Sequence, residues 1–112
     1  MYISNGTISG GTSLSPAMAM NNSFVSGIII PATWSAADLT FQVSFDGTNF
    51  YDLYDGTDGT EVVIKGIAGK ALRVAPVDFM GYTYLKVRSG TGATPVNQTG
   101  DKLITVVYGN RL

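Results

Sequence analysis

The sequence predicts an all-β protein in which two antiparallel sheets pack as a sandwich, in a jelly-roll-like arrangement. Three observations support this class: short β-forming segments are separated by turn signals, no segment has the apolar period of an amphipathic helix, and residues 39–54 have the pattern of a hairpin. We expect about seven or eight short strands and at most one short helical turn. A small barrel is the alternative that the same pattern allows.

The hairpin over 39–54 is the clearest local signal. Apolar residues occupy every second position from 39 to 45, which is typical of a strand with one buried face. Asp46 and Gly47 favour a tight turn, and an aromatic-rich segment returns over 50–54. We expect the core positions Phe41, Val43, Phe45 and Leu53. The polar residues of the alternation, which take the other face, are Thr40, Gln42, Ser44 and Asp46.

The segments before this hairpin give weaker signals. Residues 1–12 are rich in Gly, Ser and Thr, so we expect an N-terminal arm that is flexible, or held by a sheet edge or another subunit; residues 13–112 then form a single domain. The segment 14–20 contains a proline and is expected at a sheet edge. A further strand is expected over 23–30. Trp34 follows it, and we expect its ring to close one end of the sandwich rather than to contact a ligand.

The segments after the hairpin continue the strand pattern. Further strands are expected over 60–65, 71–75, 83–89 and 102–108. The last of them is apolar on both faces, which predicts a position inside a sheet or under a cover. Residues 76–81 begin with proline and end with glycine, which favours one helical turn that places Phe79 and Met80 over the core.

Composition limits the chemistry that this chain can perform. Its 112 residues suffice for one domain with its own core, and they include neither cysteine nor histidine. Disulfides, thiolate sites and the commonest general base and metal ligand are therefore excluded. We expect no enzyme, no catalytic residue, no metal site and no cofactor. The formal net charge of −1 offers no attraction to nucleic acid or to an anionic membrane.

The surface is expected to carry little charge. Charged residues make up 13% of the chain, about half of the usual fraction. Low charge is typical of a secreted protein, or of one that neighbours cover in an assembly; alternatively, Ser, Thr and Asn supply the surface polarity. Residues 1–6 lack the basic and apolar regions of a signal peptide, so we expect no secretion signal.

Two groups of side chains could bind a ligand. The carboxylates gather between residues 46 and 61, where they suit either a Ca²⁺ site or turn formation; Asp-Gly pairs favour turns, and nothing places a pair in a glycosidase cleft. These carboxylates are Asp46, Asp52, Asp55, Asp58 and Glu61. An aromatic platform for sugars would draw on Trp34, Phe50, Tyr51, Tyr54, Tyr82 and Tyr84, most of which we expect in core or cross-strand packing.

Partner contacts are expected at two places. Basic side chains take outward positions on strands that could be neighbours, where they form either a stripe for an acidic partner or an ordinary solvated face. The apolar residues of the N-terminal arm are the second place. The partner-contact residues that we predict are Tyr2, Ile3, Ile8, Arg73, Lys86 and Arg88.

The central part of the chain resembles a known group of proteins. Residues 28–53 combine an apolar strand ending in Pro31, a connector with Trp34, an alternating strand, a Ser-x-Asp-Gly-Thr turn and an aromatic return strand. This combination resembles a pattern found in small structural proteins of tailed bacteriophages. The later segments 76–81, 84–91 and 94–98 are similar to the same group, so the resemblance covers roughly residues 24–108. The Ser-x-Asp-Gly hairpin alone also occurs in discoidin-like and other carbohydrate-binding sandwiches.

The resemblance implies a non-enzymatic virion protein with a jelly-roll-like sandwich. The first expectation is a decoration (cement) protein that binds the outer capsid shell and stabilises it, with the major capsid protein and copies of itself as partners, and neither nucleic acid nor membrane. It would lie on the exterior of the particle, after assembly in the host cytoplasm. The alternative is a carbohydrate-binding or adhesion module of a tail or head fibre that recognises a host-surface glycan. A small secreted bacterial adhesion module is a third possibility.

Overall fold

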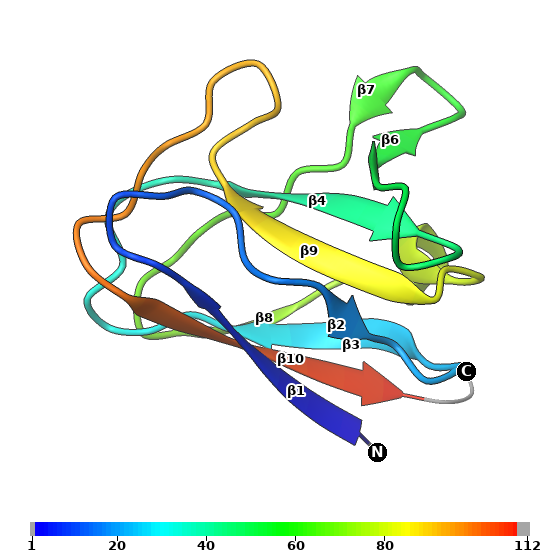
Figure 1. The fold of residues 1–112 in the computed structure, drawn as a ribbon, viewed down its shortest axis with the longest axis horizontal. Coiled ribbons are helices and arrows are strands. Elements are labelled where there is room, and N and C mark those ends of the chain that lie inside the picture. The colour runs from blue at the N-terminus through cyan, green and yellow to red at the C-terminus, as the bar shows by residue number, and fades with distance from the viewer. Residues whose placement is uncertain (1, 110–112) are drawn as a thin grey trace.

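The computed structural model describes residues 2–109 as a sandwich of two four-stranded antiparallel sheets (Figure 1). The first sheet has the order β1-β10-β3-β8, and its strands are β1 (Tyr2–Ile8), β10 (Lys102–Gly109), β3 (Phe24–Ile29) and β8 (Ala71–Arg73). The second has the order β2-β9-β4-β5, with β2 (Met18–Ala19), β9 (Tyr84–Ser89), β4 (Leu39–Ser44) and β5 (Tyr51–Asp52). A separate ribbon pairs β6 (Tyr54–Asp55) with β7 (Thr60–Glu61).

The order of the strands is that of a jelly roll. Between β1 and β4, and again from β8 to β10, each strand is followed in sequence by a strand of the other sheet, and every pairing is antiparallel. The predicted all-β sandwich is therefore confirmed. Across residues 2–109 the strands number ten, more than expected, because the N-terminal segment is itself a strand and the return segment after β4 divides into β5 and β6.

The core lies between the two sheets. Its first-sheet side chains include Ile28, Ile104, Val106 and Tyr108, and its second-sheet side chains include Leu39, Phe41, Leu85 and Val87. Trp34 packs in the core rather than at the surface, as predicted: it is buried, and its Nε1 donates a hydrogen bond to the carbonyl of Ala37 at 3.0 Å. The predicted helical turn is the 3₁₀ helix η1 (Pro76–Phe79), which places Phe79 edge-on against Phe41 with ring centroids 4.9 Å apart. Met80 was wrongly predicted to cover the core; it follows the helix in an extended conformation and is exposed.

The N-terminal segment is part of the sandwich. All seven residues of β1 pair in register with β10, and Ile8 is fully buried in the core. We expected this segment to be either flexible or held by a sheet edge or another subunit. The structure shows that a sheet edge holds it, so the expectation of a flexible arm is wrong for residues 2–8. The strand β10 lies between β1 and β3, so of the two predicted alternatives the position inside a sheet is confirmed. Residue 1 lies outside the described residues.

The central hairpin differs from its prediction at its tip. The strand β4 ends at Ser44, whose Oγ accepts hydrogen bonds from the backbone N–H groups of Asp46 and Gly47. The alternation therefore stops before Phe45, whose side chain is 66% exposed and lies against Tyr82 instead of entering the core. The other three predicted core positions, Phe41, Val43 and Leu53, are buried as expected. Within residues 2–109, no helix is long and apolar enough to span a bilayer.

Candidate functional site

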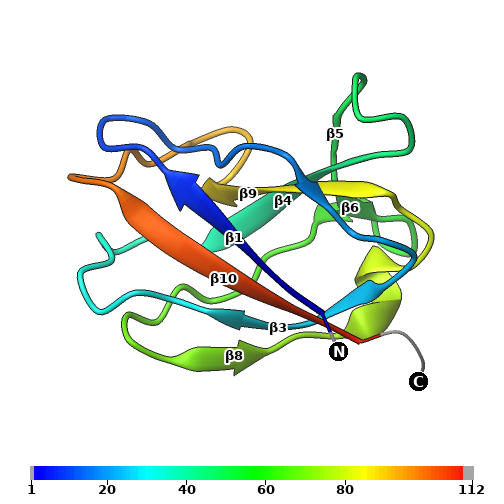
Figure 2. The same ribbon diagram turned by 60° about the horizontal axis from the view of Figure 1, so that its bottom comes forward.

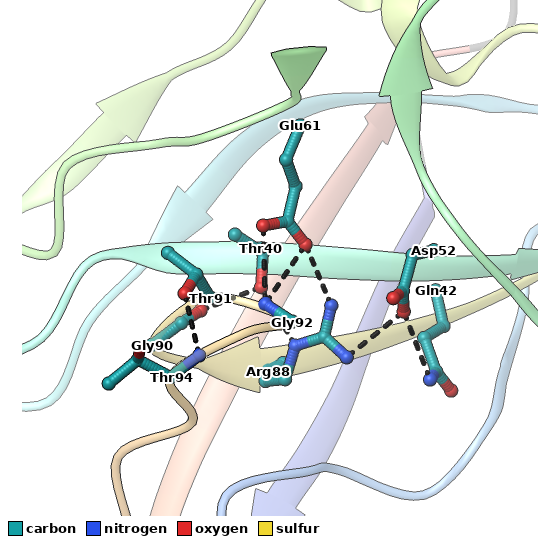
Figure 3. Close-up of polar contacts among 9 residues, drawn as sticks. All are labelled: Thr40, Gln42, Asp52, Glu61, Arg88, Gly90, Thr91, Gly92 and Thr94. Atoms are coloured by element: carbon teal, nitrogen blue, oxygen red, sulfur yellow. Dashed lines mark hydrogen bonds and ion pairs between the residues drawn. The ribbon is translucent and has the colours of Figure 1, made fainter. Parts of the chain in front are cut away.

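A cluster of charged side chains lies on the outer side of the second sheet, with Arg88 at its centre (Figure 3). The guanidinium of Arg88 donates to Thr40 Oγ1 at 2.9 Å, to Asp52 Oδ1 at 3.0 Å and to Glu61 Oε2 at 2.9 Å. The Glu61 carboxylate also accepts the backbone N–H of Gly92, at 3.1 Å to Oε2. The cluster therefore joins β9, β4, β5, β7 and the loop that follows β9.

The local sequence explains why these groups meet. Thr40 and Arg88 are opposite each other in the β4–β9 register, and both side chains point away from the sandwich core. Thr40 also donates its hydroxyl to the carbonyl of Gly90 at 2.6 Å. The loop approaches the carboxylates at Gly92, where a Cβ would lie 2.9 Å from Asp52 Oδ2 and 3.1 Å from Glu61 Oε2.

The geometry of the cluster suits a structural clamp. One cation lies between two carboxylates, so Asp52 and Glu61 do not face each other across an open cleft as an acid and base pair would. Among the described residues, every buried side-chain nitrogen or oxygen atom has a hydrogen-bond partner. The cluster thus offers a ligand no unsatisfied buried group.

The expected basic stripe does not form. Arg88 is buried beneath Glu61 and the following loop, so the expectation that it is open to solvent is wrong. Arg73 belongs to the first sheet and Lys86 to the second, so the three side chains do not share a face. Lys86 is half-buried and places its Nζ 4.2 Å from the centroid of the Phe50 ring.

The remaining carboxylates of the 46–61 segment stabilise turns by accepting hydrogen bonds from nearby residues. The Oδ1 of Asp46 accepts the backbone N–H groups of Thr48 and Asn49 at 2.9 and 2.8 Å, and these bonds, chiefly that from Asn49, hold its pKa well below the ordinary value. Hydrogen bonds from Thr60 lower the pKa of Asp58 in the same way. Within residues 2–109, no three Asp or Glu side chains gather in a metal-binding arrangement.

The outer face of the first sheet has the opposite character. Two rows of residues cross all four strands in register, and a third row crosses β1 and β10. We use the name "outer face" for these ten residues: Ile3, Val107, Gly27 and Arg73; Asn5, Thr105, Ile29 and Ala71; Thr7 and Leu103. Arg73 is the only charged residue among them.

Large apolar side chains of the outer face are open to solvent. The exposed fractions are 53% for Ile3, 49% for Leu103 and 43% for Ile29. These three side chains lie in three different rows, among the uncharged polar residues Asn5, Thr105 and Thr7. A face that exposes several large apolar side chains and so little charge is a candidate for contact with another molecule. The outer face is therefore the best candidate interaction surface in the described part of the chain.

The structure separates the predicted partner residues. Ile3 and Arg73 both belong to the outer face, at the two ends of one row. Tyr2 is half-buried on the core side, where its ring lies 4.9 Å from that of Tyr108, and Ile8 is fully buried. Sequence reasoning missed Ile29 and Leu103 as surface residues. The available signal was the apolar character of both faces of 102–108, of which only one face packs in the core.

Exposed aromatic side chains occur in one continuous segment, 45–54. Phe45, Tyr51 and Tyr54 are all more than half exposed. Trp34 is buried, whereas Phe50, Tyr82 and Tyr84 are half-buried. The pool of aromatic residues for an exposed platform is therefore smaller than the sequence alone allowed.

No protein family matches the sequence, and no curated protein matches it. Among solved structures, the chain is similar to the crystal structure of SPBc2 prophage-derived protein YomS. The two are 12% identical, the alignment covers 97% of this chain and 96% of that chain, and the TM-score is 0.49. A likeness this distant assigns neither a family nor a function to the chain.

Proposed function

We propose that the chain is a non-enzymatic structural protein of a tailed-bacteriophage virion, and specifically a decoration protein that binds the outer capsid shell. Two things support this proposal. Residues 28–53 and the segments 76–81, 84–91 and 94–98 resemble small virion proteins. The sandwich also presents a broad, nearly uncharged outer face, while its charged cluster on the second sheet is internally paired.

The observation that carries the proposal is the exposure of Ile3, Ile29 and Leu103 on one face. Burial of apolar surface yields about 25 cal/mol per Å², so this face gains free energy when a neighbouring protein covers it. A single such contact is weak. Many identical contacts on a symmetric shell hold the subunits together by multivalency, which is how a decoration protein stabilises a capsid.

The copy number of the chain in purified particles tests the location. A decoration protein occurs in hundreds of copies, whereas a tail or fibre component occurs in a few to a few dozen. Particles stripped of the chain should also lose resistance to heat or internal pressure. Stripped particles that are as resistant as intact ones would refute the stabilising role.

A matched pair of variants tests the surface. Ile29→Asp places a charge on the outer face and should reduce binding to stripped particles at least about tenfold, because the charge must be desolvated on contact. Val63→Asp is the control, since Val63 follows β7, lies off the outer face and has the same exposed fraction, 43%. Equal binding by the two variants would exclude the outer face as the contact surface.

The exposed aromatic residues favour a second candidate, a glycan-binding module of a tail or head fibre. Tyr51 and Tyr54 are open to solvent and could stack on sugar rings. In this case Tyr51→Ala and Tyr54→Ala should abolish binding to bacterial surface glycans, and Ile29→Asp should not affect it. No glycan binding together with a high copy number would exclude this candidate.

A further inference from the structure

The strand β1 is an edge strand that pairs with β10 on one side and with no strand on its other side within residues 2–109. It stands first in the order β1-β10-β3-β8, at the opposite edge from β8 (Figure 2). In an antiparallel strand, alternate residues direct their backbone N–H and C=O groups to opposite sides. Within residues 2–109, the hydrogen bonds to the backbone of β1 come only from its pairing with β10. Half of the backbone groups of β1 therefore face away from the sandwich without a protein partner in this part of the chain.

The other three edges of the two four-stranded sheets carry features that discourage pairing. The edge strand β8 has three residues and includes Arg73, β5 has two residues and includes Asp52, and β2 has two residues and follows Pro16. Short length, charge and proline all keep an edge from pairing with another strand. By contrast, β1 has seven residues, no charge and no proline, and its register with β10 contains no bulge. Of the four edges, β1 is the one suited to accept a strand.

The sequence of β1 is complementary to itself. When two copies run antiparallel about a two-fold axis at Asn5, all seven residues find a partner: Ile3 faces Thr7 of the second copy, and Ser4 faces Gly6 of the second copy. Odd-numbered residues pair with odd-numbered ones, so the two outer faces lie on the same side. A shift by one residue would place the outer face of one copy beside the core side of the other.

We propose that β1 pairs with β1 of a second copy about this two-fold axis and joins the two first sheets into one continuous sheet. The row at the axis is compatible with this pairing, because Asn5 is uncharged and Thr105 Oγ1 uses only one lone pair of Asn5 Oδ1, at 2.8 Å, so the amide nitrogen of each Asn5 could donate to the Oδ1 of the other. The apolar outer faces also become continuous, since Ile3 then neighbours Thr7 of the second copy, which pairs with Leu103. The role of this dimer in a virion rests on the proposed function, whereas the argument that β1 pairs with a second copy does not depend on that function.

Charge substitutions at the axis test the pairing by sedimentation velocity, with the full chain at up to about 1 mM. The natural chain should form a concentration-dependent dimer. Asn5→Lys and Asn5→Asp each place like charges opposite each other and should weaken the dimer at least about tenfold. An equimolar mixture of the two variants should restore it as a heterodimer. Ala71→Lys, on the exposed side of β8 in the same sheet, is the control and should leave the dissociation constant unchanged.

Hydrogen exchange provides a measurement that needs no variant. The amides of β1 that point away from β10 should become protected as the concentration of the natural chain rises. A chain that stays monomeric at about 1 mM would overturn the proposal. Weakening by Ala71→Lys equal to that by Asn5→Lys would also overturn it, because the contact would then involve the face rather than the β1 edge. The two proposals can fail separately. If the chain is present in virions at high copy number but is monomeric, the pairing of β1 is refuted and the proposed function stands. If the chain dimerises but is absent from virions, the proposed function is refuted and the pairing stands.

Discussion

Arg88 holds one positive charge between two carboxylates on the outer side of the second sheet (Figure 3). Its side chain is buried, so its charge is compensated by protein groups rather than by water. The carboxylate of Glu61 in turn accepts a hydrogen bond from the backbone N–H of Gly92. Arg88 is therefore the residue on which the position of the β6–β7 ribbon and of the 90–95 loop depends.

Replacement of Arg88 should destabilise the fold. In Arg88→Met the carboxylates of Asp52 and Glu61 lose their cation, and we expect the free energy of unfolding to fall by about 3 kcal/mol in urea at neutral pH. A second change, Glu61→Gln in the same chain, should recover part of this loss. Lys65→Met is the control: it removes an exposed ion pair with Asp38 and should cost less than about 0.5 kcal/mol. An equal effect of Arg88→Met and Lys65→Met would contradict the clamp.

Tyr108 should make the protein sensitive to alkali. Burial raises the pKa of its hydroxyl above the ordinary value of 10.0, against the opposing effect of the hydrogen bond with Ser4. Above pH 10 the unfolded chain therefore loses this proton before the folded chain does. The contribution of Tyr108 is complete below pH 10 and is lost as the pH rises through its folded-state pKa.

The variant Tyr108→Phe isolates this contribution. Near pH 7 it should be about 1 kcal/mol less stable than the natural chain, because it lacks the hydrogen bond with Ser4. The difference in the free energy of unfolding should then narrow above pH 10, since other titrating groups are common to both chains. Urea unfolding at a series of pH values measures it. A difference that stays constant up to pH 11 would contradict the prediction.

At the scale of elements, alternation in the sequence identifies strands and the side of the sheet on which each residue lies. It correctly placed Phe41 and Val43 inside, and it placed Arg88 on the outer side of β9. It did not reveal that Arg88 is covered, because the covering groups Asp52 and Glu61 are 36 and 27 residues away in sequence. It also failed at Phe45, because β4 ends at Ser44, where the hydroxyl of Ser44 accepts hydrogen bonds from the backbone N–H groups of Asp46 and Gly47 that begin the turn.

The 90–95 loop should be sensitive to a single methyl group. A Cβ at Gly92 would come within 3.1 Å of two carboxylate oxygens, so in Gly92→Ala either the loop or the carboxylates that Arg88 holds must shift, which weakens the hydrogen bonds from the Gly92 N–H to Glu61. We expect a loss of about 1–2 kcal/mol in the free energy of unfolding. Gly56→Ala is the matched control, because a Cβ there meets no atom within 4 Å. Similar unfolding midpoints for the two variants would show that the loop adapts freely.

At the scale of the whole molecule, the fold class could be predicted from the spacing of turns and from the lack of helical periodicity. The pairing of the first strand, β1, with the last strand, β10, could not be predicted in this way. Residues 2–8 contain few large apolar side chains, so their own composition suggests an arm. Their order comes from the ladder with β10 and from the burial of Ile8 beside residues far along the chain. Composition indicates what a segment can bury on its own. In a jelly roll, however, the first and last strands are far apart in sequence and become neighbours only in the folded sandwich.

Removal of β1 distinguishes a strand from an arm. A chain that lacks residues 1–8 exposes the edge of β10 and the core beside Ile104, and it loses the fully buried Ile8. Its free energy of unfolding should fall by more than about 4 kcal/mol, a large part of the stability of a small domain. Ile3→Ser is the control, since it keeps the strand and removes only an exposed side chain, and it should change stability by less than about 0.5 kcal/mol. Thermal unfolding followed by circular dichroism measures both, and an unchanged melting temperature for the shortened chain would show that β1 contributes nothing to the sandwich.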